Sequence, residues 1–140
     1  MVKVLHKAVW AAFGLLLAGQ GLASEELRAV PNPPSGLVLE LTDIILDAQP
    51  DLDTVYTRFR FMVPELAEGD VPEFEVLARD FEYLCNEFAL PIVLKSADPV
   101  DRIVISYSDR PVGFGETNPD ARQFFEQFGV QNGACIWENY

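Results

Sequence analysis

The chain has 140 residues, of which 22 are Asp or Glu and 10 are Lys or Arg, so its formal net charge is −12 at pH 7. This length is that of one domain, and the surplus of acids disfavours binding to nucleic-acid phosphates and to anionic membrane surfaces. Two cysteines are too few for a thiolate zinc site. We therefore expect no nucleic-acid partner, no cofactor and no bound metal.

Residues 1–23 have the pattern of a secretory signal peptide. Two lysines form a basic start, residues 8–18 form an apolar core, and small residues precede a cleavage site after Ala23. A membrane anchor is the alternative, but a membrane-spanning helix needs about 20 apolar residues and this core is shorter. We expect export to the periplasm and no stable membrane insertion after cleavage. Because cleavage removes His6, the single histidine, the mature chain would lack any His-dependent catalytic centre.

The first half of the mature chain predicts a lead-in and a hairpin. Residues 24–35 are rich in proline and are expected to be extended and poorly packed. Apolar and polar residues alternate in 36–46 and again in 54–63, which predicts two antiparallel strands. The loop between these strands contains three aspartates, Asp47, Asp51 and Asp53. Clustered carboxylates can bind calcium, but the twelve-residue calcium-loop pattern is incomplete, so a solvated loop is favoured.

A helix is predicted to follow Asp70. This residue can cap the first turn, with Glu73 at the reciprocal position of a capping box. Apolar residues then recur at helical spacing and predict a stripe that faces the core. They are Phe74, Leu77, Ala78, Phe81, Leu84, Cys85 and Phe88. The pair Leu90-Pro91 predicts the end of this helix, because the residue before proline avoids the helical region.

The second half predicts two further strands and a second helix. Residues 91–95 form a short apolar run, and residues 102–107 alternate and are rich in β-branched side chains. The stretch 108–117, rich in Pro and Gly, predicts a loop. The second helix is predicted from Pro119 to about Phe128, on the helical spacing of four residues. These are Ala121, Phe124, Phe125 and Phe128.

The predicted fold is a single α+β domain over residues 36–140, with an antiparallel or mixed sheet of about four to five strands and two helices. In an exported protein, two cysteines are most economically paired. A bond between Cys85 and Cys135 would close a loop of about 50 residues and, in the chain-entropy model, contribute about 4 kcal/mol.

Several local motifs together resemble those of a known family. They are Leu84-Cys85 in a helix ending Ala89-Leu90-Pro91, Ile105-Ser106-Tyr107-Ser108-Asp109-Arg110-Pro111, Phe114-Gly115, Pro119-Asp120, Gln123-Phe124-Phe125-Glu126 and Gly133-Ala134-Cys135-Ile136-Trp137-Glu138. As a set, covering most of the mature chain, they resemble a family of small exported alphaproteobacterial proteins of unknown function. Some members are labelled acetolactate synthase, a label we reject because the chain is too short for a thiamine-diphosphate enzyme and carries an export signal. The resemblance implies a compartment and a disulfide, and no activity.

The loop after the strand at 102–107 is the candidate binding site. Arg110 offers a planar fork to a carboxylate, and Asp109 could orient it. The alternative, which turn chemistry favours, is that Asp109 caps the turn and Arg110 pairs within the chain. Further candidate contact residues are Glu116, Gln123 and Tyr140.

The sequence favours a protein that is not an enzyme. We expect an envelope module that binds a protein or peptide through residues 109–117. One alternative is a carboxylate-dependent hydrolase of envelope glycan, which would need Asp109 and either Glu116 or Glu138 in one cleft. A small-molecule carrier is another, and it would need an apolar pocket.

Overall fold

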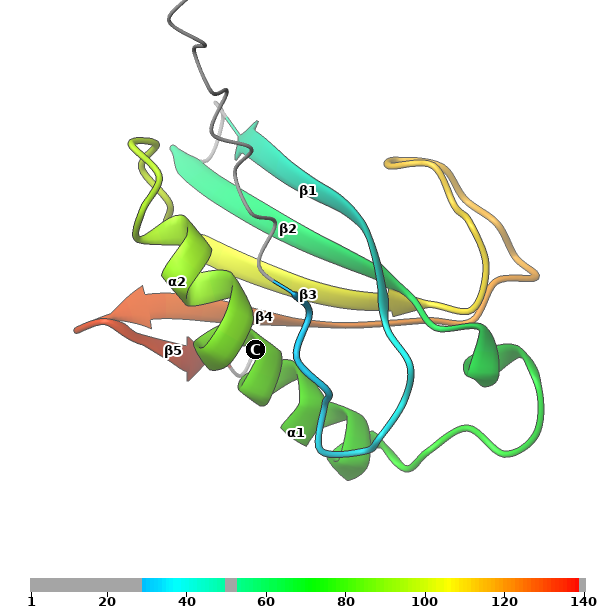
Figure 1. Cartoon of the computed structure of the whole chain (residues 1–140). Helices are drawn as coiled ribbons and strands as arrows, with labels where there is room; N and C mark the ends of the chain where they lie inside the picture. The colour runs from blue at the N-terminus through cyan, green and yellow to red at the C-terminus, as the bar shows by residue number, and fades with distance from the viewer. Residues whose placement is uncertain (1–28, 50–52, 139–140) are drawn as a thin grey trace, which may run out of the picture.

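A computed structural model describes residues 29–49 and 53–138, so the predicted signal peptide, Asp51 and Tyr140 lie outside the described residues. Five strands form one mixed sheet in the order β1-β2-β3-β4-β5, and a single helical segment crosses one of its faces (Figure 1). The strands are β1 (Glu40–Gln49), β2 (Thr54–Met62), β3 (Arg102–Ser108), β4 (Gln123–Gln131) and β5 (Ala134–Trp137). The helical elements are η1 (Pro64–Ala67), α1 (Phe74–Leu84), η2 (Cys85–Ala89) and α2 (Leu90–Val93). The prediction of an α+β fold with a mixed sheet is confirmed, but residues 29–49 and 53–138 contain only one long helical segment instead of the two predicted.

The strand connections explain the place of the helix. β1 and β2 pair antiparallel, as predicted for the hairpin, with an irregularity between Leu41 and Asp43. β2 and β3 pair parallel, and parallel neighbours need a long crossover, which is supplied by the segment from η1 to α2. β3, β4 and β5 then follow as antiparallel neighbours.

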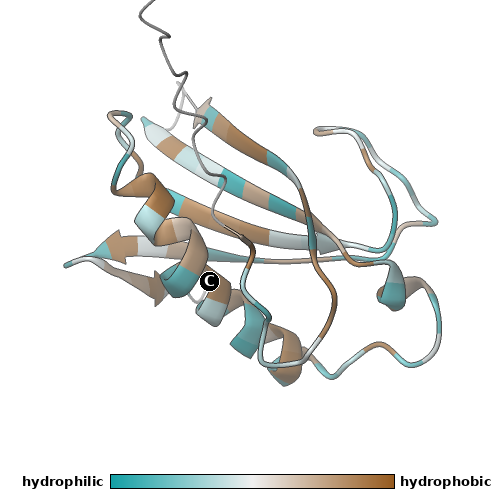
Figure 2. Ribbon diagram, in the orientation of Figure 1, coloured by the Kyte–Doolittle hydropathy of each residue, from teal (hydrophilic) through white to brown (hydrophobic). Residues whose placement is uncertain are grey.

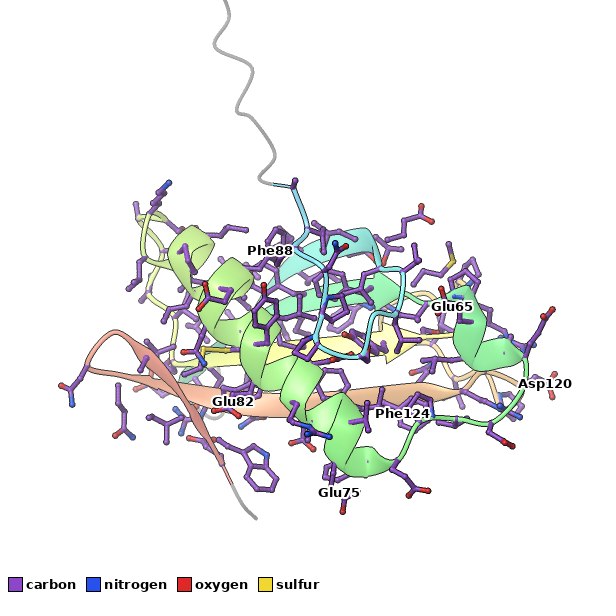
Figure 3. All side chains as sticks on the ribbon, turned by 60° about the horizontal axis from the view of Figure 1, so that its bottom comes forward. Glu65, Glu75, Glu82, Phe88, Asp120 and Phe124 are labelled. Carbon is purple, nitrogen blue, oxygen red and sulfur yellow. A yellow bond between two sulfur atoms is a disulfide. The ribbon has the colours of Figure 1, made fainter. Side chains whose placement is uncertain are left out.

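The helical segment is amphipathic along its length (Figure 2). Its buried stripe confirms the predicted core face at Leu77, Phe81, Leu84, Cys85 and Phe88, whereas Phe74 at its start is half exposed. On the outer side, Glu75 and Glu82 project away from the sheet (Figure 3).

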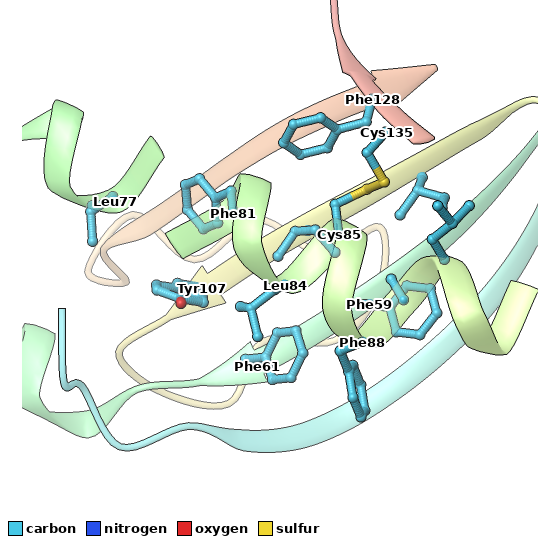
Figure 4. Packing of buried hydrophobic residues seen from close by; sticks show 14 of the residues in the cluster. Phe59, Phe61, Leu77, Phe81, Leu84, Cys85, Phe88, Tyr107, Phe128 and Cys135 are labelled. Carbon is cyan, nitrogen blue, oxygen red and sulfur yellow. A yellow bond between two sulfur atoms is a disulfide. The ribbon is translucent and has the colours of Figure 1, made fainter. Parts of the chain in front are cut away.

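The core lies between this stripe and the inner face of the sheet (Figure 4). Phe88 packs edge-on against Phe59, with ring centroids 6.0 Å apart, and Phe81 packs in the same way against Tyr107, at 4.8 Å. Cys85 and Cys135 form the predicted disulfide inside this core, with an S–S distance of 2.06 Å. The bond joins the helix to β5, the last strand of the sheet.

Two predictions about the ends of the first helix are wrong. The residue at its N-cap is Glu73, which makes no side-chain capping bond, and Asp70 lies outside the helix. At the other end the helix continues through Pro91 to Val93, so the strand predicted at 91–95 is absent. A turn of π-helix, η2, ends at Ala89, two residues before Pro91. Proline lacks an amide donor and crowds the preceding turn of a regular α-helix, and a π turn at this point changes the hydrogen-bond ladder that proline would disrupt.

The predicted second helix is also wrong, because its residues form β4. Phe124 and Phe128 pair with Tyr107 and Ile103 of β3 and share their face of the sheet. Phe125 points to the other face, where its side chain is 68% exposed. A four-residue spacing fits a strand as well as a helix, since four is twice the strand period.

The described part of the lead-in, residues 29–35, is packed, in contrast to the prediction. Pro33 is buried, and Val30 packs against the core. The hydroxyl of Ser35 donates to Asp80 of α1 over 2.6 Å, and Tyr107 donates to the same carboxylate over 3.2 Å. Asp80 is fully buried, so these donors replace the water that the carboxylate loses on folding. Burial, followed by the nearby charge of Asp80, raises the pKa of Tyr107 far above its usual value.

Candidate functional site

The face of the sheet opposite the helix is the candidate site, and a long loop at 109–122 stands at one end of it (Figure 1). Two arginines of β2 hold this loop. The Arg60 guanidinium donates through Nη2 to the carbonyl of Val112. The Arg58 guanidinium lies over the ring of Phe114, with 5.6 Å between its central carbon and the ring centroid. The loop is therefore tied to the middle of the sheet.

Two adjoining hollows lie between the loop and the open face. The larger has a volume of about 480 Å³, within the range of ligand pockets, and the smaller about 170 Å³. The residues that line both are Arg60, Ser106, Val112, Gly113, Glu116 and Gln123. We call these two hollows together the sheet-face cleft.

Asp109 holds Arg110 in a two-pronged ion pair beside the cleft. The Nε and Nη2 atoms of Arg110 each lie 3.0 Å from one carboxylate oxygen of Asp109. The amide of Arg122 donates to the same carboxylate over 3.1 Å. Asp109 is buried, and the hydrogen bonds from Arg110, followed by the bond from the Arg122 amide, lower its pKa below the usual value of 3.8.

The arginines of β2 also pair with acids on β1. Arg58 lies 2.9 Å from Asp47, and Arg60 lies 3.0 Å from Asp43. Asp47, expected in a solvated loop, thus belongs to a strand, while Asp53 ends the turn before β2. Among the described residues no group of three or more His, Cys, Asp or Glu side chains could hold a metal ion.

The predicted contact residues divide into two groups. Arg110, Glu116 and Gln123 line the cleft, and Asp109 lies behind Arg110 as its partner. Glu116 folds back over the loop, since a Cβ at Gly113 would lie only 2.5 Å from its carboxylate carbon.

Glu138 does not join Asp109. It pairs with Arg102, over 2.8 Å, at the start of β3, whereas Asp109 follows the end of that strand. Seven residues of extended chain separate the two positions, a span of about 23 Å. The pairing of Asp109 with Glu138 that the hydrolase alternative allowed is therefore absent.

Two exposed aromatic residues of the cleft were not among the predicted contacts. Phe114 and Phe125 both line the smaller hollow, and their side chains are 52% and 68% exposed. Sequence reasoning assigned Phe125 to the buried stripe of a helix. A strand interpretation of residues 123–131 would have separated Phe125 from Phe124 and Phe128, because neighbours in a strand point to opposite faces.

The fold and the cleft define a small disulfide-bonded α+β domain with a partly open sheet face. Within the part of the chain that the structure describes, no helix is long and apolar enough to cross a membrane. The chain belongs to the family described as a family of unknown function, DUF6497, whose model matches residues 15–140. This confirms the resemblance to a family of unknown function. No curated protein and no solved structure matches the chain.

Proposed function

We propose that this protein is a non-catalytic module of the cell envelope that binds a protein or peptide in the sheet-face cleft. The observation that carries the proposal is the pair of exposed rings, Phe114 and Phe125, that line one hollow on a sheet face that no described helix covers. Exposed aromatic residues beside arginines are characteristic of the central contacts of protein interfaces. The Arg58 guanidinium packs against the ring of Phe114. This contact restricts the position of the ring in the unbound protein, which lowers the entropy cost of binding.

The charges of the molecule support the same face. Apart from Arg79 and Lys95, every basic residue in the described part of the chain lies on a strand of the open face or in the adjoining loop. The outer side of the helix carries acids, including Glu75, Glu82 and Glu87. On the open face these arginines offset acids such as Asp43 and Asp47, so in a chain with a net charge of −12 this face repels an acidic partner less than the outer side of the helix does.

The carboxylates favour binding over hydrolysis. The Asp109 carboxylate accepts hydrogen bonds from Arg110 and Arg122, so it is already engaged as an acceptor. Its lowered pKa also opposes the protonated state that a general acid needs. We assign Asp109 the role of orienting Arg110, which keeps further donors for a partner carboxylate.

The test is a crosslinking pull-down from the cell envelope with three tagged single variants. Phe114→Ser and Phe125→Ser remove the two rings of the cleft, and Phe74→Ser is the matched control, since its ring is 49% exposed at the start of α1. We expect the first two variants to lose a discrete partner that the wild type and the control retain. Capture that is the same in all proteins, or is lost equally in the control, would contradict the proposal.

A fourth variant, Arg110→Ala, tests the ion pair. We expect it to weaken capture of the same partner. Its thermal midpoint must stay within a few degrees of the wild type, because Asp109 is buried and loses its cation in this variant. The double variant Asp109→Asn with Arg110→Ala leaves no unpaired carboxylate. If this double variant has normal stability but does not capture the partner, the loss of binding is due to the missing guanidinium of Arg110.

The envelope location rests on the apolar N-terminal segment and on the disulfide, which is typical of oxidising compartments. Cell fractionation and the intact mass of the alkylated, unreduced protein test it. We expect a periplasmic chain that begins at Ser24 and accepts no alkyl group. A cytoplasmic chain with two alkylated cysteines would exclude this location.

A further inference from the structure

The outer edge of β1 is the feature that the proposed function does not use. β1 is the outermost strand of the sheet and is ten residues long (Figure 1). No strand of the described chain pairs with this outer edge. The opposite edge of the sheet is only the four-residue β5. A long unpaired edge presents main-chain donors and acceptors that can pair with another extended chain.

The side chains of β1 alternate between a row in which two aspartates flank Ile45 and a row that is apolar. On the open face, Asp43 and Asp47 lie beside Arg60 and Arg58 of β2. Asp43 keeps 46% of its side chain exposed, whereas Asp47 keeps 15%. On the helix side, Ile44 and Leu46 are 42% and 50% exposed (Figure 2 shows this hydrophobic stretch of β1). A new strand at this edge would meet two acids on either side of Ile45 on one face, and apolar side chains on the other.

We propose that β1 accepts an extended segment of a partner protein as a sixth strand, with basic residues opposite Asp43 and Asp47 and apolar residues opposite Ile44 and Leu46. The charged residues of the open face carry this inference. β2 contributes Arg58 and Arg60, and β1 contributes the aspartates that pair with them. Basic residues on an added strand would place these carboxylates between two sets of cations. In strand addition, main-chain hydrogen bonds supply affinity and the alternating side chains supply specificity.

A second copy of the chain is a poorer occupant. Antiparallel pairing of two β1 strands about Ile45 would place Asp43 opposite Asp47 of the other copy, and parallel pairing in register would place like residues together. Carboxylates directly opposite one another destabilise a strand pair, whereas opposite charges stabilise it. In these two registers the edge favours a basic segment over its own sequence.

The probe is an acetylated peptide with lysines opposite Asp43 and Asp47 and valines opposite Ile44 and Leu46. It is titrated calorimetrically into the oxidised full chain, and amide hydrogen exchange of β1 is measured with and without it. We expect binding that slows exchange in β1, with no binding of a peptide in which glutamates replace the lysines. N-methylation of alternate peptide amides should abolish binding, because it removes the main-chain donors.

The protein variants separate strand addition from general attraction to an acidic chain. Asp43→Lys should weaken binding by up to about fivefold, as expected for loss of a cross-strand charge pair of up to about 1 kcal/mol. Glu87→Lys makes the same charge change on the exposed side of η2 and should bind as the wild type does. Phe125→Ser should also bind normally, so that failure of the cleft and failure of this edge are distinguishable.

Three results would overturn the inference. Equal weakening by Asp43→Lys and Glu87→Lys would show attraction to net charge alone, and undiminished binding of the N-methylated peptide would exclude strand pairing. A concentration-dependent dimer in native mass spectrometry that is lost in Ile44→Lys would assign the edge to a second copy.

Discussion

Ser35 and Asp80 are 45 residues apart in the chain and form a two-point contact. The Ser35 hydroxyl donates to one carboxylate oxygen over 2.6 Å, and its main-chain amide donates to the other over 2.9 Å. Asp80 has no exposed surface, so the proline-rich segment is anchored in the core and not on its rim. The first described residues of the chain are therefore part of the folded domain.

Ser35→Ala should destabilise the protein by about 1.5–3 kcal/mol, the range for a hydrogen bond to a charged group, because the Asp80 carboxylate loses a donor where water is excluded. The measurement is urea unfolding followed by circular dichroism. The matched control is Ser96→Ala, since Ser96 also donates to an aspartate, Asp98, but in an exposed turn. Equal effects of the two variants would show that burial adds nothing to the Ser35 bond.

Tyr107 should make stability fall at alkaline pH. Its folded-state pKa is raised, mainly by burial, whereas an unfolded tyrosine ionises near pH 10. Above about pH 10 the unfolded chain loses the proton first, so the free energy of unfolding decreases as pH rises further. We expect a shallower decline in Tyr107→Phe, measured by urea unfolding between pH 9 and 11. Identical slopes would contradict the assignment.

Asp109 should have the opposite effect at acidic pH. Its folded-state pKa is lowered by the hydrogen bonds from Arg110, so its contribution to stability is present above the ordinary value of 3.8. This contribution is lost as pH falls from there through the folded-state pKa, because the unfolded chain takes up the proton first. Asp109→Asn should therefore lose less stability than the wild type between pH 5 and 2. A parallel decline in both proteins would show that the ion pair is not coupled to folding.

The disulfide should account for a large share of stability. Loss of the bond between Cys85 and Cys135, by their joint replacement with alanine, should cost about 4 kcal/mol from released chain entropy, out of a typical total of about 5–15 kcal/mol. The urea midpoint of the double variant, compared with that of the oxidised and the reduced wild type, measures this cost. A midpoint equal to that of the oxidised protein would show that core packing alone sets stability.

The elements that sequence reasoning placed correctly have patterns that admit one interpretation. β2 and β3 alternate with strand periodicity, and α1 carries a stripe at helical spacing that continues over several turns. Two of the errors, the strand at 91–95 and the second helix, arise where the pattern is ambiguous. Residues 91–95 form an apolar run too short to show any period, and Phe124 and Phe128 are four residues apart, which suits both a helix and a strand.

Tertiary pairing resolved these ambiguities. Residues 123–131 become β4 because β3 offers an edge on one side and β5 closes a hairpin on the other. The candidate site depended on the same step: only a strand places Phe125 on the open face, away from Phe124, and beside the hollow lined by Phe114. Local residue preferences could not predict that residues 123–131 form a strand, since the strands with which they pair lie elsewhere in the chain.

The sequence by itself determined the α+β class, the hairpin of β1 and β2, the buried stripe of the first helix and the pairing of Cys85 with Cys135, because periodicity and cysteine number are local or countable properties. Only the tertiary structure decided that Arg58 and Arg60 hold the loop, that Asp109 lies buried behind Arg110, and that the edge of β1 is unpaired within the described chain. The physical reason is that these relationships join residues across strands, and strand order and register are set by the packing of the whole domain.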